Sequence, residues 1–388
     1  MNELRLKQLL DRFPRIKVLV VGDYFLDKYL DLDRRLSETS LETGLEVYQA
    51  TGVRSSPGAA GTVVNNLRAL DVQVSALGVI GDDGEGYELR RGLAARGVHT
   101  DPLIVHPERF TPTYLKPMMR EPDGRLHELN RVDTKNRSPL PEALEDQLVA
   151  RLRAAADSVH GMVVADQVPE TNCGAITGQV RAALSELGRG RPELVIAVDS
   201  RARIGLFQDV ILKPNAREAL GAGLIGTRGS SWELKGTHGK ESPRDRMSSY
   251  ESLRDPTSSY TCPTAGAGEF PRVPRGERAE VEAAGMALFQ QTGRPVFVTI
   301  GADGILVFTV EGVQHAPGVR VSGPLDIVGA GDSVMSGIMA ALCAGASPGE
   351  AALVGNLVAS ITVQQIGTTG TATREQVLER LRELEPGA

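Results

Sequence analysis

The stretch Gly323-Pro324-Leu325-Asp326-Ile327-Val328-Gly329-Ala330-Gly331-Asp332-Ser333 decides how the rest of this 388-residue chain is interpreted. Its Gly-Ala-Gly turn is small enough for the backbone to come close to a ligand. Apolar residues recur at helical spacing from Ser333 to Cys343, so the turn is expected at the N-terminus of a helix. Free N–H groups and the positive end of the helix dipole suit such a turn to phosphate oxygens.

Asp332 is the unexpected residue of this turn. A carboxylate repels a bound anion, so it does not serve simple phosphate binding. Its presence is explained if it takes a proton from a hydroxyl group that then attacks phosphorus. The alternative is a plain helix cap, because aspartate is a preferred N-cap residue. A lone Gly-x-Gly-Asp would favour the cap.

The stretch resembles the signature of the ribokinase-like (PfkB) carbohydrate kinases, usually written Asp-Thr-x-Gly-Ala-Gly-Asp, with Ile327 in place of the usual Thr. The resemblance implies that Gly329, Ala330 and Gly331 form the anion hole for the transferred phosphate. It implies further that Asp332 is the catalytic base and that ATP and Mg²⁺ are the cofactors. The departure at Ile327 touches a flanking position, so the phosphate turn and the base are intact.

Strands alternate with helices along the chain, which indicates an α/β protein with a mainly parallel sheet in three layers. The resemblance implies the same architecture: a ribokinase-like three-layer α/β/α fold with a mainly parallel central sheet and a small β-lid. Three apolar runs end in an acidic residue, at the edge where α/β sheets place their ligands. These residues are Asp23, Asp166 and Asp199.

The resemblance also sets the domain organisation. The kinase domain is expected over residues 14–380, after an N-terminal helix over residues 1–13. A β-lid that keeps water from the sugar is expected from about 28–55 and 108–135, and ordinary edge hairpins are the alternative. Residues 222–278 are rich in Ser, Gly, Pro, Thr and Arg and are interpreted as a flexible insertion.

The substrate motif is the degraded part of the resemblance. Gly22-Asp23-Tyr-Phe-Leu-Asp27 resembles a Gly-Asp-x-x-x-Asp whose last aspartate binds sugar hydroxyls in the family. The segment from Ser56 to Asn66 resembles the first family signature, but Ala59 replaces its second Gly and Thr62 stands where Asn is common. Close helix packing is the alternative use of its small residues. The implied substrate residues are Asp27, Gly58, Asn66, Asp326 and Arg131.

The nucleotide motif is sharper. In Lys213-Pro-Asn215-Ala-Arg-Glu218, Asn and Glu lie three apart at a helix start and therefore share a face. The family uses Asn-x-x-Glu to order Mg²⁺ through water, whereas a capping box is the alternative. A Val-Thr-x-Gly-x-x-Gly begins at Val298, and in the family it contacts the nucleotide. The implied nucleotide residues are Asn215, Glu218, Thr299, Gly301, Gly304 and Asn356, with Asn215 and Glu218 also serving the metal.

Composition excludes several classes of protein. With 41% hydrophobic and 24% charged residues, a globular protein with a sizeable core is expected. The net charge is −6 and no Lys/Arg stripe is interleaved with aromatic residues, so no nucleic-acid partner is expected. No stretch approaches the roughly 20 apolar residues of a membrane span. The N-terminus lacks the apolar run of a signal peptide, so a cytoplasmic protein without membrane contact is expected.

The prediction is an ATP-dependent kinase that transfers the γ-phosphate to a hydroxyl of a sugar or sugar phosphate. Within the family, the chain most resembles the kinases of heptose 7-phosphate, and a homodimer through the β-lid is a further expectation. A nucleoside kinase is one alternative. A non-catalytic sugar or nucleotide sensor is another, although a sensor would not need Asp332. A nicotinamide-dependent oxidoreductase ranks last, because no Gly-x-Gly-x-x-Gly follows the first strand.

Overall fold

The computed structural model of the protein describes residues 1–226, 277–367 and 369–384. The insertion predicted at 222–278 therefore lies almost entirely outside the described residues. Within this part of the chain, none of the helices combines the length and the apolar character that a membrane crossing needs.

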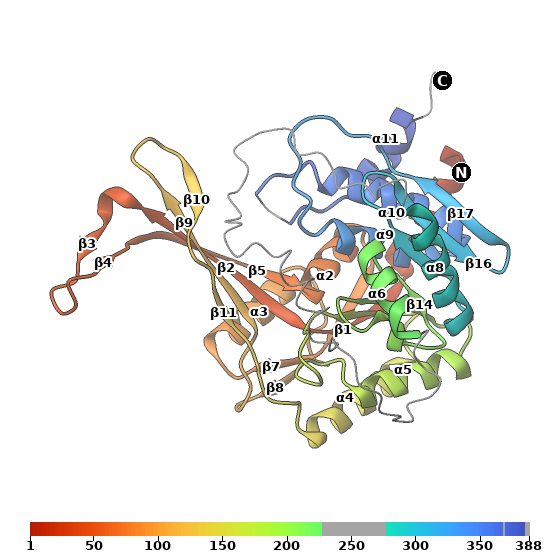
Figure 1. The fold of residues 1–388 in the computed structure, drawn as a ribbon, viewed down its shortest axis with the longest axis horizontal. Coiled ribbons are helices and arrows are strands. Elements are labelled where there is room, and N and C mark those ends of the chain that lie inside the picture. The colour runs from red at the N-terminus through yellow and green to blue at the C-terminus, as the bar shows by residue number, and fades with distance from the viewer. Residues whose placement is uncertain (227–276, 368, 385–388) are drawn as a thin grey trace, which may run out of the picture.

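Within the described residues, a central sheet of eight strands forms the middle layer of the molecule (Figure 1). Six neighbouring strands of this sheet, β6, β1, β12, β13, β14 and β15, pair in parallel. Strands β16 and β17 continue the sheet in antiparallel fashion and form one of its edges. The predicted mainly parallel sheet is thus confirmed. In spatial order the strands are β6 (Gln73–Leu77), β1 (Lys17–Gly22), β12 (Gly161–Asp166), β13 (Val195–Ser200), β14 (Ile211–Leu212), β15 (Val296–Thr299), β16 (Gly304–Thr309) and β17 (Gly312–Pro317).

Helices cover both faces of this sheet, because successive strand residues point to opposite sides. Val18 and Val20 of β1 join one buried cluster, and Leu19 and Val21 join the other. The first cluster holds α1 (Glu3–Leu10), α2 (Ala60–Ala69), α3 (Gly84–Ala94), α9 (Ala330–Cys343), α10 (Pro348–Thr362) and α11 (Arg374–Leu384). The second holds α4 (Glu142–Ala155), α5 (Gly178–Gly190), α6 (Ala216–Gly226) and α8 (Arg278–Thr292).

A second sheet projects from the body, to the left in Figure 1, and is called the lid here. Its long strand β2 pairs with β5 in antiparallel fashion and with β9 in parallel. Because β2 follows β1 directly, the lid begins where the central sheet ends. The lid strands are β2 (Tyr24–Asp33), β5 (Ala50–Ala59), β9 (Thr113–Arg120), β10 (Leu126–Glu128) and β11 (Val132–Thr134), with β3 (Glu38–Thr39) and β4 (Glu46–Val47) at the tip. A separate pair is β7 (Val79–Gly81) and β8 (Ile104–His106).

Glycines fix the position of helix α9, whose N-terminus carries the Gly-Ala-Gly turn. A methyl group at Gly337 would lie 2.8 Å from the Cα of Gly355 in α10, so the two helices cross in direct backbone contact. On the sheet side, a methyl at Gly161 of β12 would lie 2.4 Å from the Cε of Met339. Helix α9 is therefore held between α10 and the sheet, and its first turn is held with it.

Candidate active site

The turn before α9 presents an open helix N-terminus. Gly329 is the N-cap residue, adopts the left-handed conformation with φ of 81°, and provides no side-chain cap. Asp326 shapes the loop, since its carboxylate accepts hydrogen bonds from the backbone N–H groups of Val328 (3.1 Å) and Gly367 (3.2 Å). The free N–H groups of the first helical turn are those that bind phosphate in other proteins.

Asp332 lies in the first turn of α9 and does not cap the helix. Within the described part of the chain, no hydrogen bond or ion pair reaches its partly exposed carboxylate. Burial and the neighbouring Asp199 carboxylate raise its pKa from 3.8 to about 7, against the opposing charges of Lys213 and Arg201. A carboxylate with this pKa is suited to accept a proton near neutral pH.

Lys213 is a site residue that the sequence reasoning did not single out. It follows β14, is 3% exposed, and forms an ion pair of 2.9 Å with Asp199 at the end of β13. Burial alone would lower its pKa, but the carboxylates of Asp199, Glu218 and Asp332 raise it above the usual value. A lysine directly after a buried strand, with an aspartate at the end of the preceding strand, was the available signal.

Asn215 and Glu218 begin helix α6 and bind each other. The Asn215 N–H donates to Glu218 Oε2 at 2.8 Å, and the Glu218 N–H donates to Asn215 Oδ1 at 2.9 Å. This is the capping box that was the alternative to metal binding. Burial and Asp199 raise the pKa of Glu218. The Thr299 N–H donates to Pro214 at 3.0 Å, so two of the predicted nucleotide segments are neighbours.

The other predicted nucleotide residues meet near β17. Gly301 and Gly304 have φ values of 66° and 98°, and a methyl at Gly304 would lie 2.3 Å from the carbonyl oxygen of Ala316. Asn356, which is 6% exposed, donates through Nδ2 to the carbonyls of Ala316 and Pro317 at 3.0 Å each. In this structure Gly304 and Asn356 hold the β16–β17 hairpin in place.

The predicted substrate residues Asp27 and Gly58 face each other across the lid. Asp27 forms an ion pair of 2.9 Å with Lys116 of β9. A methyl at Gly58 would lie 2.3 Å from Asp27 Oδ2, so only glycine leaves room for the carboxylate there. The negative charge of Asp27 also contributes to the raised pKa of Asp332, so the two carboxylates act on each other electrostatically.

Asn66 lies beneath the turn. It is 1% exposed, donates to the Thr62 carbonyl at 3.0 Å, and accepts from Ser333 Oγ at 3.3 Å. Thr62 reaches the turn itself, since its Cγ2 lies 3.3 Å from a methyl placed at Gly329. Both residues therefore tie α2 to the start of α9.

Ala59, which replaces the second Gly of the family signature, is strained. Its φ of 52° and ψ of −118° place it in a region that residues with a side chain rarely occupy. Ala59 thus adopts a conformation that glycine, with no Cβ, would adopt more readily.

Two of the carboxylates at the strand ends serve the structure. Asp166 is 1% exposed and paired with Arg203 at 2.6 Å. Asp23 accepts the N–H groups of Gln167, Val168 and Ala175 at 2.7–3.0 Å, and burial raises its pKa to about 6. Their hydrogen-bonding capacity is engaged by the protein.

A pocket of about 460 Å³ lies between the lid and the central sheet. Arg131, whose guanidinium lies 4.3 Å from the centre of the Tyr114 ring, lines it together with Arg201 and Lys135. Arg201 also lowers the pKa of Asp332, so one cation of this pocket acts electrostatically on the candidate catalytic residue.

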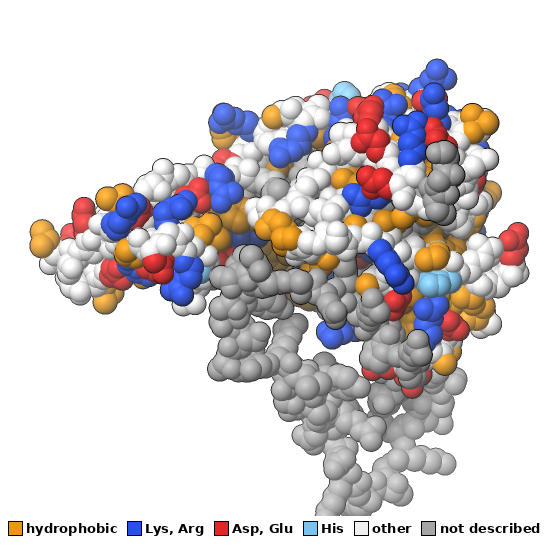
Figure 2. All heavy atoms as spheres, turned by 90° about the horizontal axis from the view of Figure 1, so that it is seen from above, with side chains coloured by type: hydrophobic (Ala, Val, Ile, Leu, Met, Phe, Trp, Pro, Cys, Tyr) orange, Lys and Arg blue, Asp and Glu red, His pale blue; other side chains and the backbone are white. Residues whose placement is uncertain are grey.

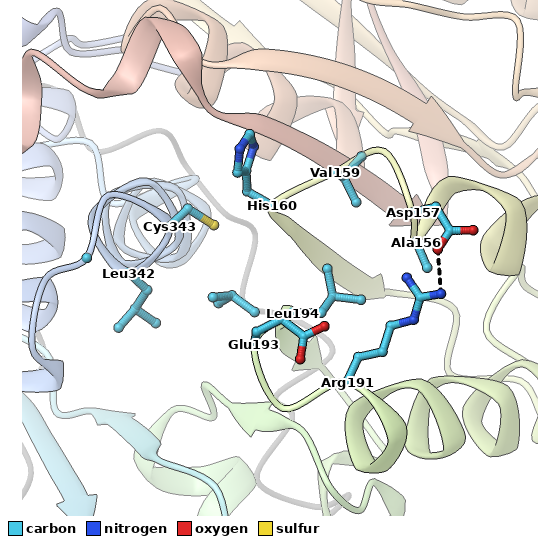
Figure 3. A pocket seen from close by; sticks show the side chains of 11 residues that line it. Ala156, Asp157, Val159, His160, Arg191, Glu193, Leu194, Leu342 and Cys343 are labelled. Atoms are coloured by element: carbon cyan, nitrogen blue, oxygen red, sulfur yellow. Dashed lines mark ion pairs between the residues drawn. The ribbon is translucent and has the colours of Figure 1, made fainter.

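A second hollow, of about 390 Å³, lies at the N-terminal ends of the central strands β12 and β13 (Figure 3). It is lined by Cys343, the last residue of α9, and by Val195, the first residue of β13. Figure 3 shows His160 on one side and the ion pair between Arg191 and Asp157 (2.5 Å) on the other. None of the predicted site residues lines this hollow.

Comparison with known proteins identifies the family of the chain. The family model described as pfkB family carbohydrate kinase matches residues 16–184 and 244–374. The chain therefore belongs to the pfkB family of carbohydrate kinases, a class of phosphotransferases.

Among curated proteins, the chain is similar to the bifunctional protein HldE of Citrifermentans bemidjiense, with 29% identity over 98% of the chain and 66% of the relative. The HldE of Nitrosococcus oceani is also 29% identical, over 96% of the chain and 65% of the relative. The chain thus spans about two thirds of the length of these relatives.

Solved structures show the same fold. The ribokinase of Arabidopsis thaliana complexed with ribose and ATP aligns with a TM-score of 0.60 and 16% identity, over 95% of the chain and 99% of that structure. A phosphofructokinase-like structure from Staphylococcus aureus aligns with a TM-score of 0.61 and 17% identity, over 93% and 95%. The predicted ribokinase-like fold is confirmed.

Proposed function

We propose that this protein is an ATP-dependent kinase that phosphorylates a hydroxyl group of a sugar phosphate. The observation that carries the proposal is the Asp332 carboxylate, which has no ion-pair partner among the described residues and a pKa of about 7, beside an open helix N-terminus. A base and an anion site within one helical turn are the two elements that phosphoryl transfer to a hydroxyl requires.

In the proposed reaction, Asp332 takes the proton of the acceptor hydroxyl. The acceptor oxygen forms a bond to the γ-phosphorus of ATP while the bond from that phosphorus to the bridging β–γ oxygen breaks. ADP leaves with that oxygen. The N–H groups of Gly329 and Gly331 neutralise charge on the transferred group, whereas the Ala330 N–H donates to the Ile327 carbonyl at 3.1 Å. Catalysis is positioning and charge stabilisation.

We propose that the nucleotide lies over the segments that meet at Asn215, Thr299 and Asn356. Among the described residues, no three His, Cys, Asp or Glu side chains gather as a metal cage. This fits Mg²⁺, which takes few protein ligands when it is bound with nucleotide phosphates and keeps several waters. The oxygen donors of Asn215 and Glu218 suit such a water-mediated contact. When bound, Mg²⁺ would supply positive charge to the nucleotide phosphates.

The pocket between the lid and the central sheet, where the acceptor would bind, supports a substrate that already carries a phosphate group. Within the described residues, neither Lys135 nor Arg201 has a carboxylate partner within ion-pairing distance, although both line the 460 Å³ pocket. Arg109 is unlike them, because it donates to the carbonyls of Ser138 and Cys173. Two such cations in one pocket, one of which also acts on the pKa of Asp332, favour an anionic acceptor over a neutral sugar. Asp27, Gly58 and Arg131 would contact its hydroxyl groups.

We further propose that the lid forms a homodimer interface in the cytoplasm, where ATP is available. The lid carries a series of exposed hydrophobic residues interleaved with charged ones, on the projecting part seen in Figure 2. Clusters of this kind mark protein interfaces. They are Leu36, Leu41, Leu45, Val47, Tyr48, Val53, Leu126 and Val132. A monomer mass by light scattering at micromolar concentration would contradict this interface.

The test of the function is ADP release from ATP·Mg²⁺ across sugars and sugar phosphates of five to seven carbons. The Asp332→Asn variant is the blank. Turnover on a sugar phosphate that disappears in the variant supports the proposal. Turnover on neutral sugars alone would contradict the phosphorylated acceptor. If the protein binds ATP but phosphorylates none of the tested compounds, the result would favour a sensor.

A further inference from the structure

A buried ion pair lies directly behind the anion turn. The ammonium group of Lys213 and the carboxylate of Asp199 are 2.9 Å apart, with side chains 4% and 13% exposed. Lys213 Nζ lies 3.7 Å from the position that a methyl group at Gly331 would take. Within the described residues, it is the one atom outside the helix backbone and the chain neighbours of Gly331 that comes within 4 Å of that position. The Lys213 ammonium group therefore lies directly beside Gly331 of the turn.

The stability of the fold does not by itself explain why this ion pair is buried. Removing two charges from water costs several kcal/mol per ion, and apolar residues of similar volume often serve a core as well or better. Lys213 also has three carboxylates near it, because Asp199, Glu218 and Asp332 all act on its pKa. One buried cation among three acids leaves a local excess of negative charge, which is unfavourable for anion binding unless the ammonium group is directed at the anion.

We propose that Lys213 is a catalytic residue that contacts the phosphoryl group in transfer, and that Asp199 is the positioning residue that holds its ammonium group under the turn. The inference depends on the proposed function and extends it to two residues outside the predicted site. In the transfer step, Lys213 donates hydrogen bonds to the oxygens of the moving phosphoryl group, and no proton leaves it.

The same pair sets the proton affinity of the base. Among the described residues, the charges that act most strongly on Asp332 are those of Asp199 and Asp27, which raise its pKa, and those of Lys213 and Arg201, which lower it. Removal of Lys213 and removal of the Asp199 charge should therefore move the acid limb of the pH profile in opposite directions. These displacements measure how strongly the pair acts on Asp332, whereas contact between Lys213 and the phosphoryl group is tested by kcat and by binding of a phosphoryl mimic.

The experiment compares Lys213→Met and Asp199→Asn with the wild type, and Arg5→Met serves as control. Arg5 forms an ion pair of 2.8 Å with Glu350, on the first-cluster side of the fold and outside the site. We expect Lys213→Met to lower kcat by about 10²–10³-fold, the effect of removing one transition-state donor. The acid limb of kcat/KM should move about one pH unit upward in Lys213→Met and downward in Asp199→Asn. The control should match the wild type.

A binding measurement without turnover completes the test. Calorimetry compares Mg·ADP alone with Mg·ADP plus aluminium fluoride, which mimics the phosphoryl group in transfer. Lys213→Met should bind Mg·ADP nearly as the wild type does but lose about tenfold or more in the fluoride complex. Equal affinity of both proteins for the fluoride complex would overturn the role of Lys213.

The outcomes separate the two proposals. A wild-type protein without kinase activity on any acceptor contradicts the proposed function. A wild type that is active, with Lys213→Met within about threefold of its kcat or with both acid limbs displaced in the same direction, overturns this inference alone. If circular dichroism shows that Lys213→Met is unfolded, Asp199→Asn decides: weaker binding of the fluoride complex by about tenfold or more, with Mg·ADP binding retained, supports the inference, and unchanged binding of the fluoride complex overturns it.

Discussion

Replacement of Asp332 by Asn should abolish catalysis and stabilise the protein at the same time. The side chains have nearly the same shape, but Asn carries no negative charge and accepts no proton. We expect kcat to fall by about 10²–10⁴-fold, as for loss of a general base. The folded protein should become harder to unfold above neutral pH, because a charge in an unfavourable position is removed.

The size of the stability gain follows from the pKa. Asp332 has a folded-state pKa of about 7 against 3.8 ordinarily, so the folded protein binds the proton more tightly than the unfolded chain. Its stabilising effect is complete below pH 3.8, is lost as the pH rises to about 7, and stays lost above that. The limit is about 4 kcal/mol. Because the carboxylate is partly solvent-exposed, we expect about 1–2 kcal/mol at pH 8, and roughly a third of it at pH 5.

The assay is thermal unfolding of both proteins at pH 5 and pH 8, with ADP release measured on the same samples. Asp23→Asn is the matched control, since burial also raises the pKa of Asp23, to about 6. Asp23 accepts three backbone N–H groups, so an amide NH₂ there would face donors. The control should lose about 1–3 kcal/mol of stability at pH 5. It should lose less at pH 8, where the Asp23 carboxylate of the wild type is itself unfavourably charged.

Two results would refute the reasoning about Asp332. Full activity in Asp332→Asn would show that the carboxylate is not the base. A variant that is less stable than the wild type at pH 8 would show that the charge is favourably placed, which contradicts the raised pKa.

Three further outcomes follow from the geometry of the acceptor side. Ala59→Gly should raise the free energy of unfolding by about 0.5–2 kcal/mol, because relief of strain outweighs the greater freedom of Gly in the unfolded chain. Denaturant unfolding measures this change, and a loss of stability would refute the strain at Ala59. Gly58→Ala should raise the KM of the acceptor about tenfold or more and leave that of ATP nearly unchanged, since a methyl would lie 2.3 Å from Asp27 Oδ2; equal effects on both substrates would contradict a local role. Lys135→Ala combined with Arg201→Ala should raise the KM of a sugar phosphate about tenfold or more and spare the unphosphorylated sugar; equal losses would place the phosphate elsewhere.

The sequence predicted the fold because fold depends on local and repetitive signals. Apolar runs such as Ile16 to Val21, separated by helical periodicity, are sufficient to specify a mainly parallel sheet with helices on both faces. The Gly-Ala-Gly turn at 329–331 was placed at the start of a helix by the same means. These features depend on residues that are neighbours along the chain.

The sequence could not decide what its isolated polar residues do. Asn215 and Glu218 fitted a capping box and a metal site equally well by spacing, and the structure has them bonded to each other. Asn66 matched a family position, yet its amide is buried against Thr62 and Ser333. In each case the hydrogen-bond partner of the side chain could be known only from the structure.

What the sequence by itself determined is therefore the class of fold, the turn that can hold a phosphate, and the presence of an aspartate beside it. Only the tertiary structure decided that Asp332 lacks a hydrogen-bonding partner among the described residues, that its pKa lies near 7, and that Lys213 faces the same turn. The physical reason is that burial and charge interactions depend on distances in space. Asp199, Lys213 and Asp332 come from three separate segments, and only folding brings their charges together.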